Sequence, residues 1–373
     1  MRRAIVIVMD GCGVGAAPDA AEFGDVWNPN TLRHVFDAAP FQTPTLERLG
    51  LLAAAGIPSS EPEGQWGRLR PMSQGGKDSV TGHWEIAGIR VPTRFPTYPN
   101  GFPADLVSEF ENRIGAKVLG NKPASGTAIL DELGEEHVRT GHPILYTSAD
   151  SVFQVAAHED VIPIEKLYDW CEIGREISKV QRVIARPFIG TPGAWVRTER
   201  RKDWPLVPPH NLVDAVGNVR GIGVVPELFS GRNFLPGPRT QSNKEHGAAL
   251  LAALNEPNRF IWANFEDFDM KYGHRSDPAG FARCLEAFDA YLTDFLPRLS
   301  PDDLLILTAD HGNDPTDQST DHTREYVPVV LWSPSSTRKE LGDVEGFDAI
   351  GATVAAWIGV DWSQGINLKA KRL

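Results

Sequence analysis

The segment AIVIVMDG at residues 4–11 restricts the fold of this chain more than any other feature. It is a continuous apolar run rich in β-branched residues, which is typical of a strand buried on both faces of a parallel sheet. The run ends in Asp10 and Gly11, and open α/β sheets place their chemistry at the C-terminal ends of their strands. The segment therefore predicts a central strand that delivers Asp10 to the functional edge of an α/β sheet.

From Asn211 onward, strand-like and helix-like segments alternate along the chain. The predicted strands in this part are 221–229, 259–267, 302–312 and 326–334, and the predicted helices are 242–256, 277–299 and 349–359. Such alternation indicates a mostly parallel sheet with helices on both faces. Earlier in the chain, TPTLERLGLLAAAG at 43–56 predicts one helix with a Thr cap, and DSVTGHWEIAG at 78–88 predicts a polar turn that opens another helix.

The middle of the chain differs in composition from both of its flanks. Clusters of Pro and Gly such as VPTRFPTYPNGFP begin near residue 92, and shorter α+β elements follow until about residue 205. Because α/β alternation occurs on both sides of this region, we expect an inserted α+β domain at 92–205. The core domain would then be formed by residues 1–91 and 206–373.

The overall charge argues against a nucleic-acid or anionic-membrane surface. The formal net charge is −12 over 373 residues, whereas a phosphate-tracking face needs clustered Lys and Arg. No apolar stretch approaches the roughly 20 residues of a membrane-spanning helix, and MRRAIVIVMDG is too short for a signal peptide. We therefore expect a cytoplasmic protein whose partners are small molecules, and we infer no obligate protein partner.

Acidic and histidine residues follow three of the predicted strands. They are Asp10 after the first strand, Asp269 and His274 after 259–267, Asp310 and His311 at the end of 302–312, and His322 in the loop beyond. Each residue alone has a structural explanation, such as a helix cap or a solvated loop histidine. Their combination favours borderline cations such as zinc and manganese, and six ligands are enough for two ions. Two neighbouring ions can hold both oxygens of a phosphoryl transfer.

Three further charged residues lie in the C-terminal loop TADHGNDPTDQSTDHTREYVP at 308–328. Asp314 and Asp321 are expected to stay outside the ligand set, where they make turns or hold a ligand histidine by its second nitrogen. Arg324 has two open interpretations, an ion pair with a nearby carboxylate and a contact that steers phosphate.

The segment GGKDSVTGHWE at 75–85 offers a hydroxyl that can accept a phosphoryl group. Thr81 follows a Gly-rich turn near the predicted start of a helix, where anions bind favourably. Beside two cations its alkoxide becomes accessible at neutral pH. Ser79 competes for the same role, and the residues alone leave both candidates open.

Four longer segments resemble the prokaryotic phosphopentomutases of the alkaline phosphatase superfamily. They are KDSVTGHWE, GNKPASGTAILDELGEEHVRTGHPILYTSADSVFQVAAHE, DFDMKYGHR and TADHGNDPTDQSTDHTREYVP. The resemblance covers nearly the whole chain and implies an alkaline-phosphatase-like α/β core with an inserted α+β cap domain that binds substrate. It also implies interconversion of ribose 1-phosphate and ribose 5-phosphate, and of the 2-deoxyribose pair. The alternative is a related mutase or phosphatase of this superfamily that acts on a different sugar phosphate.

The same resemblance implies roles for the residues after the strands. One Mn²⁺ ion would be held by Asp10, Asp310 and His311 with Thr81, and a second by Asp269, His274 and His322. Thr81 matches the residue that is phosphorylated in the family, so the implied mechanism passes through a phosphothreonine and a pentose bisphosphate. The expected activator is a sugar bisphosphate such as glucose 1,6-bisphosphate or ribose 1,5-bisphosphate.

The resemblance also implies a substrate site in the cap domain. The run YTSADSVFQ places Ser148 and Asp150 near the ribose and its distal phosphate, and IARPFIG places Arg186 as a phosphate clamp. A guanidinium group suits this role because its planar fork matches phosphate geometry.

One segment departs from the family pattern. In FSGRNFLPGPRTQSNKEH, Gln241 stands where the family commonly has a lysine near the substrate. Arg232 and Arg239 are the candidates for the missing positive charge, so the resemblance leaves the sugar preference open.

Overall fold

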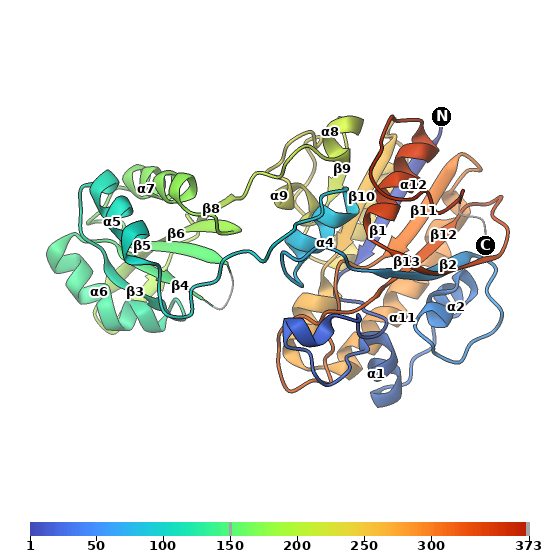
Figure 1. Ribbon diagram of the computed structural model, residues 1–373, viewed down its shortest axis with the longest axis horizontal. Coiled ribbons are helices and arrows are strands. Elements are labelled where there is room, and N and C mark those ends of the chain that lie inside the picture. The colour runs from blue at the N-terminus through green and yellow to red at the C-terminus, as the bar shows by residue number, and fades with distance from the viewer. Residues whose placement is uncertain (149–150, 371–373) are drawn as a thin grey trace. The chain divides into compact units, whose positions relative to one another are not determined.

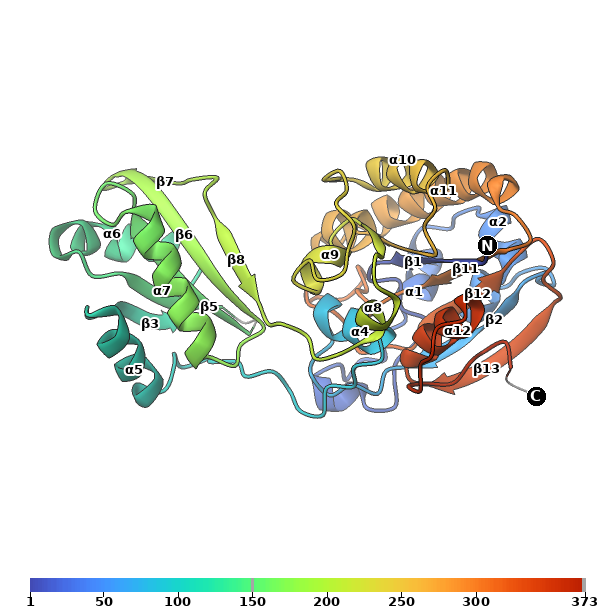
Figure 2. The ribbon, with the colours of Figure 1, turned by 90° about the horizontal axis from the view of Figure 1, so that it is seen from above.

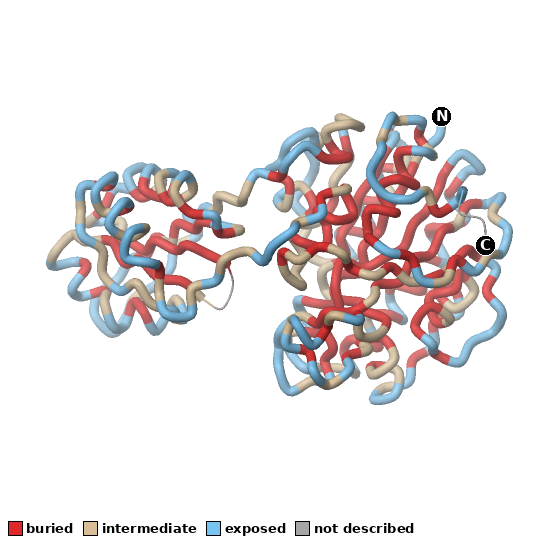
Figure 3. Tube along the Cα trace, viewed as in Figure 1, coloured by how far each residue is buried: buried red, intermediate tan, exposed pale blue. Residues whose placement is uncertain are grey.

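The computed structural model describes residues 1–148 and 151–370, which form two compact units (Figure 1). One unit comprises residues 1–93 and 208–373, and the other comprises 94–207. The sequence predicted the inserted segment at 92–205, and its function as a substrate-binding cap stays a prediction. Figure 3 shows a buried interior in each unit, so each has a core of its own.

The first unit contains a seven-stranded sheet. Its strands, in spatial order, are β13 (Lys339–Glu345), β2 (Gln65–Arg70), β12 (Val327–Trp332), β11 (Asp303–Thr308), β1 (Arg3–Met9), β10 (Phe260–Phe265) and β9 (Arg220–Ile222). Strands β9, β10, β1 and β11 are mutually parallel, whereas β12 runs antiparallel to both of its neighbours. The predicted α/β class with a mostly parallel sheet is confirmed, and β1 lies at the centre of the parallel part.

Helices cover both faces of this sheet, as the view in Figure 2 shows. One layer comprises α1 (Thr31–Ala38), α2 (Pro44–Leu49), α3 (Leu51–Ala54), α10 (Asn243–Ala253) and α11 (Pro278–Phe295). The other comprises α4 (Ser79–Ile86), α8 (Leu212–Val216), α9 (Val225–Leu228) and α12 (Asp348–Ile358). β1 is buried along its apolar run between these layers. In the described part of the chain, no helix is long and apolar enough to cross a membrane.

The predicted single strand at 221–229 is wrong. The chain forms β9 for three residues and then turns into the short helix α9. Pro226 lies in the first turn of α9, where its missing N–H costs nothing, whereas in a central strand it would remove a ladder hydrogen bond. The backbone N–H of Val224 donates to Glu266 at 2.6 Å, which holds the turn against the end of β10.

The predicted single helix at 43–56 is also wrong, because Gly50 divides it into α2 and α3. Gly50 has a φ of 108°, which interrupts the helical backbone. Thr43 precedes α2, but its side chain makes no capping hydrogen bond. A Cβ atom at residue 50 would stand 2.7 Å from the Cβ atom of Trp66 in β2. The break therefore lets the two short helices pack closely on the sheet.

We expect Gly50→Ala to lower the free energy of unfolding by about 2–3 kcal/mol, because it combines positive-φ strain with the contact against Trp66. Urea unfolding measures the loss. Gly56→Ala is the matched control, since Gly56 also has a positive φ of 66° while a Cβ atom there would meet nothing within 4 Å. We expect a loss of about 1 kcal/mol for the control. Equal losses would show that the contact with Trp66 contributes nothing.

The second unit is built on a mixed six-stranded sheet. Its strands are β3 (Leu119–Pro123), β4 (Ile144–Thr147), β5 (Val152–His158), β6 (Arg182–Thr191) and β7 (Ala194–Arg197) in spatial order, with β8 (Lys202–Pro205) paired to β6. Its helices are α5 (Ala104–Ile114), α6 (Ala128–Thr140) and α7 (Ile164–Ile177). Phe110 of α5 and Trp170 of α7 pack with Phe153 of β5 in one apolar cluster.

Candidate metal centre and active site

The predicted ligands gather at one edge of the seven-stranded sheet. Asp10 directly follows β1, Asp310 and His311 follow β11, and Asp269 lies in a helical turn just after β10. Because β1, β10 and β11 are adjacent and parallel, their carboxyl ends meet at the same edge. His274 in a 3₁₀ turn and His322 in the C-terminal loop reach this edge from the side of β10 and β11, respectively.

The first group of ligand atoms belongs to Asp10, Asp310 and His311, and all three residues are buried. One ligand atom from each lies within 4.8 Å of the others. Nε2 of His311 is 3.3 Å from Oδ1 of Asp10 and 3.4 Å from Oδ2 of Asp310. This grouping contains three of the four ligands expected for one ion. The fourth, Thr81, donates its hydroxyl to Asp78 instead.

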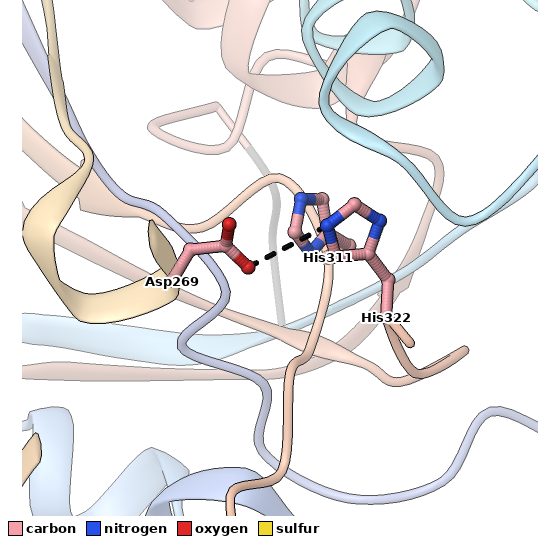
Figure 4. Close-up of side chains that lie close together, drawn as sticks. All are labelled: Asp269, His311 and His322. Atoms are coloured by element: carbon pink, nitrogen blue, oxygen red, sulfur yellow. Dashed lines mark ion pairs between the residues drawn. The ribbon is translucent and has the colours of Figure 1, made fainter. Parts of the chain in front are cut away.

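The second group belongs to Asp269, His311 and His322, whose side chains converge in Figure 4. Nε2 of His322 lies 3.5 Å from Oδ1 of Asp269. His274 joins this group, since its Nε2 lies 3.1 Å from Oδ2 of Asp269 and 3.2 Å from Nε2 of His322. The structure thus brings all six predicted ligands together, and His311 borders both groups.

The cluster concentrates opposed charges in a buried place. Burial, reinforced by Asp310 and Asp269, raises the pKa of Asp10 to about 6. Burial also opposes ionisation of Asp310, but His311 and His83 hold the pKa of Asp310 below its ordinary value. Burial disfavours the charged form of His311 as well, yet Asp310 and Asp10 raise the pKa of this imidazole well above its usual range. A cation is the group that neutralises such a cluster of carboxylates most directly.

The ligand atoms of the cluster have lone pairs available to bind a metal ion. Oδ1 of Asp10 and Oδ2 of Asp310 are buried and have no hydrogen-bond partner among the described residues. Nδ1 of His274 and of His311 lie 2.6 and 3.1 Å from backbone carbonyl oxygens, so these nitrogens carry the protons. In the neutral ring, Nε2 then presents its lone pair toward the carboxylates, as a metal-bound histidine does.

Sequence reasoning missed two buried amides that hold ligand carboxylates. Nδ2 of Asn264 donates to Oδ2 of Asp10 at 2.6 Å, and Nδ2 of Asn313 donates to Oδ1 of Asp269 at 2.6 Å. Asn313 lies two residues after the predicted ligand His311 in DHGND, and Asn264 lies near the end of β10 in ANFED, five residues before Asp269. Their position at strand ends beside carboxylates is the signal that could have identified them.

Helix α4 begins beside His311 and carries both candidate hydroxyls. Ser79 is its first residue, is partly exposed, and places Oγ 3.2 Å from Nε2 of His311. Thr81 is only 2% exposed, and its hydroxyl donates to Oδ2 of Asp78 at 3.1 Å. Thr81 also lines a small cavity with Asp310 and His311. Both residues are therefore near the cluster, but the Ser79 hydroxyl is the one that contacts a predicted ligand, and Ser79 is the more exposed residue of the two.

Two residues of the C-terminal loop form ion pairs outside the cluster. Oδ2 of Asp321 lies 3.2 Å from Nζ of Lys77, so Asp321 stays outside the ligand group as expected. Arg324 is 2% exposed and pairs with Asp19 at 2.9 Å. Of its two interpretations, the structural ion pair is the one that the contacts support.

Asp314 makes a turn, as expected. Its Oδ1 accepts hydrogen bonds from the backbone N–H and the hydroxyl of Thr316, while Oδ2 lies 2.5 Å from Nδ1 of His34. The histidine that Asp314 contacts therefore lies outside the predicted ligand set.

In the second unit, Arg186 lies on β6 within a polar group. Its Nε donates to Oε1 of Gln154 at 3.0 Å. Burial, together with the charge of Arg201, lowers the pKa of Arg186. Ser148 directly follows β4 and is partly buried, and Asp150 lies outside the described residues. Neighbouring guanidinium groups of this kind provide the charge that an anion site needs.

The departure at Gln241 lies in the first unit, where its side chain is exposed. Arg232 is held by an ion pair with Asp214 at 2.6 Å. The side chain of Arg239 is 90% exposed and lies 3.4 Å from Glu227. Arg239 thus keeps its guanidinium in solvent, which favours it over Arg232 as the compensating charge.

The α/β fold and its cluster of carboxylates and imidazoles define this chain as a metalloenzyme. The model of the metalloenzyme superfamily matches residues 234–362, a segment that contains every clustered ligand except Asp10. This match supports a divalent metal at the edge of the sheet.

Curated phosphopentomutases are similar to nearly the whole chain. The one from Caldanaerobacter subterraneus subsp. tengcongensis is 49% identical over 370 residues, which cover 95% of this chain and 94% of that protein. The one from Acetivibrio thermocellus is 47% identical and covers 96% of each chain. This chain belongs to the phosphopentomutase family.

Among solved structures, the PH0037 protein from Pyrococcus horikoshii matches 98% of both chains with a TM-score of 0.51. Its sequence identity is 15%, so this likeness concerns the fold alone.

Proposed function

We propose that this chain is a phosphopentomutase that interconverts ribose 1-phosphate and ribose 5-phosphate, and the corresponding 2-deoxyribose phosphates. Its similarity to curated phosphopentomutases along nearly the whole chain carries the proposal. The buried cluster of carboxylates and imidazoles at the edge of the sheet supports it, because such a cluster can hold the metal cations that stabilise the negative charge of phosphoryl transfer.

We infer that two Mn²⁺ ions bind at this cluster. Asp10, Asp310 and His311 would hold the first ion with the acceptor hydroxyl, and Asp269, His274 and His322 would hold the second. When bound, the ions would neutralise the charge that develops on the transferring phosphoryl group.

The contacts of α4 support Ser79 as the phosphoryl acceptor, although the resemblance implies Thr81. Ser79 is partly exposed and contacts His311, whereas Thr81 is nearly inaccessible and its hydroxyl is bound by Asp78. A phosphate ester on Ser79 would lie at the N-terminus of α4, where the helix dipole favours negative charge.

In the proposed reaction, the phosphorylated hydroxyl transfers its phosphoryl group to the free hydroxyl of a pentose monophosphate. The bond from the enzyme oxygen to phosphorus breaks, a new bond from the sugar oxygen forms, and the proton of the sugar hydroxyl passes to the enzyme oxygen. The resulting bisphosphate then presents its other phosphate, and the reverse transfer regenerates the phosphoenzyme. Glucose 1,6-bisphosphate or ribose 1,5-bisphosphate would charge an enzyme that has lost its phosphate.

Ser148, Asp150 and Arg186 are the proposed contacts to the pentose phosphate. We expect Arg186→Met to raise KM for ribose 5-phosphate by roughly 10-fold or more, because a charge-assisted hydrogen bond to phosphate is lost. Arg182→Met is the matched control on the same strand, since Arg182 is exposed and lies 3.7 Å from Asp203. Steady-state kinetics should leave the KM of the control within about 2-fold of the parent. Equal KM values for the two variants would remove Arg186 from the site.

The proposed function is tested by following phosphorus NMR of the purified protein with Mn²⁺ and ribose 1-phosphate. We expect ribose 5-phosphate to form and the reverse reaction to reach the same equilibrium, with faster turnover after addition of a sugar bisphosphate. Release of inorganic phosphate without isomerisation would favour the alternative of a phosphatase. Turnover measured with a panel of pentose and hexose phosphates would determine the sugar preference, which the departure at Gln241 leaves open.

A further inference from the structure

We infer that His83 is a positioning residue that ties the metal ligand Asp310 to the start of α4. The inference rests on the proposed function for the part that concerns Ser79 as acceptor. It assigns a role to the histidine of GGKDSVTGHWE, which neither the ligand set nor the acceptor explains.

The contacts of His83 fix the state of its ring. Nδ1 lies 2.9 Å from the backbone carbonyl oxygen of Ser79, one helical turn earlier. A carbonyl oxygen only accepts, so Nδ1 carries a proton. The same nitrogen lies 3.3 Å from Oδ2 of Asp310, an atom with no hydrogen-bond partner of good geometry among the described residues. One N–H group thus faces both the ligand carboxylate and the backbone of the proposed acceptor.

The surroundings of His83 leave the ring little freedom to move. The residue is 0% exposed, and its ring stacks on that of Trp262 in β10, with centroids 5.7 Å apart and an interplanar angle of 17°. Gly82 brings the backbone of α4 against the carbonyl oxygen of Asp310, because a Cβ atom at this glycine would overlap that oxygen. Gly82 therefore permits the close approach, and His83 uses it to contact the carboxylate.

Burial also separates this role from direct catalysis. A side chain with no exposed surface does not touch substrate, so His83 acts through Asp310 and Ser79 rather than on the reacting atoms. A purely structural histidine would affect folding alone. A positioning histidine would in addition change the affinity for metal, since groups that orient ligands typically contribute 10- to 100-fold to metal binding.

The test compares three variants by calorimetric titration of the purified protein with MnCl₂ and by steady-state kinetics. His83→Asn keeps a donor near the place of Nδ1, His83→Gln moves the donor toward the place of Nε2, and His83→Phe has none. We expect the Phe and Gln variants to bind Mn²⁺ roughly 10-fold more weakly or worse. We also expect their kcat to fall while KM for ribose 5-phosphate stays within about 2-fold, and the Asn variant to recover most of both losses.

His246→Phe is the matched control. His246 is also 0% exposed in the same unit, and its Nε2 also has no hydrogen-bond partner among the described residues. Its ring packs against Phe265, and its Nδ1 lies 2.7 Å from Oγ1 of Thr240. Since neither residue is a predicted metal ligand, we expect loss of His246 to leave Mn²⁺ affinity unchanged. Circular dichroism identifies variants that do not fold.

Parental Mn²⁺ affinity in the Gln variant, or in the Phe variant if it folds, would overturn the inference. Equal affinities of the Asn and Gln variants would overturn it as well, because the position of the donor would then not matter. If the parent binds Mn²⁺ but catalyses no isomerisation, the proposed function fails. The effect of His83 on metal affinity would nevertheless be measurable, so the two failures are distinguishable.

Discussion

Ser79→Ala is expected to lower turnover of ribose 5-phosphate by on the order of 10³-fold or more, because the phosphoryl acceptor of a covalent mechanism is removed. Mass spectrometry of the parent, after incubation with a sugar bisphosphate, should place one phosphate on the peptide that contains Ser79. The variant should carry none. Its Mn²⁺ affinity should fall far less than its activity, since three other ligands of the first group remain.

Thr81→Val distinguishes the two candidate hydroxyls. Valine keeps the shape of threonine, so the variant loses the hydrogen bond from the hydroxyl to Asp78 while the backbone cap at 3.1 Å remains. We expect it to lose roughly 1 kcal/mol of stability and to keep the covalent phosphate. If Thr81→Val lost the phosphate and Ser79→Ala kept it, Thr81 would be the acceptor, as the family resemblance implies.

Asp10→Asn is expected to affect metal binding and stability in opposite directions. Loss of a ligand carboxylate should weaken Mn²⁺ binding by on the order of 100-fold. Without metal, the variant should be more stable than the parent at pH 7.5 by on the order of 2 kcal/mol. The reason is that burial and the carboxylates of Asp310 and Asp269 raise the pKa of Asp10 to about 6 in the folded state.

The sign of this effect follows from proton linkage. A carboxyl group whose pKa is higher in the folded than in the unfolded protein destabilises the fold above that pKa. The Asp10 carboxyl should therefore add stability to the metal-free parent as the pH falls from about 7 toward 4, and the Asp10→Asn variant should lose this contribution. Glu266, whose pKa burial raises to about 7, contributes in the same direction in both proteins. Thermal unfolding with a metal chelator at several pH values measures both. A metal-free variant less stable than the parent would contradict the repulsion among the three carboxylates.

Asp348→Asn is the matched control for a buried carboxylate away from the metal ligands. Asp348 is 3% exposed and pairs with Arg90 at 2.7 Å. Its replacement should lower stability both with and without Mn²⁺, because it breaks a favourable ion pair, and should leave Mn²⁺ affinity unchanged.

The central strands and their terminal ligands were predictable because their signal is local. The apolar run before Asp10 is hydrophobic at consecutive positions, and a fully buried strand requires that pattern. By contrast, β2 was missed because its alternation in QWGRLR places arginines on the exposed side of a strand near the edge. The partners of β2 are β12 and β13, which lie more than 250 residues away in the chain. The local sequence of β2 therefore does not show that it belongs to the sheet.

The acceptor was not predictable because Ser79 and Thr81 are two residues apart on a helix. Side chains at that spacing point in directions roughly 200° apart, so the exact start of α4 decides which hydroxyl faces the ligands. The start is set by the cap at Asp78. Which hydroxyl then faces His311 depends on how α4 packs against the end of β11, which residue types alone do not reveal. The role of His311 in both ligand groups likewise depends on distances across three strands.

The central position of β1 has a consequence for biosynthesis. Ala4 pairs with Phe260 and Arg3 pairs with Asp303, so β1 waits for strands that are synthesised about 250 to 300 residues later. At typical translation rates this delay is roughly 10 to 60 s. The contiguous segment 94–207 is complete long before then. The apolar strand that carries Asp10 thus leaves the ribosome first and stays unpaired during most of synthesis, which favours its binding by a chaperone.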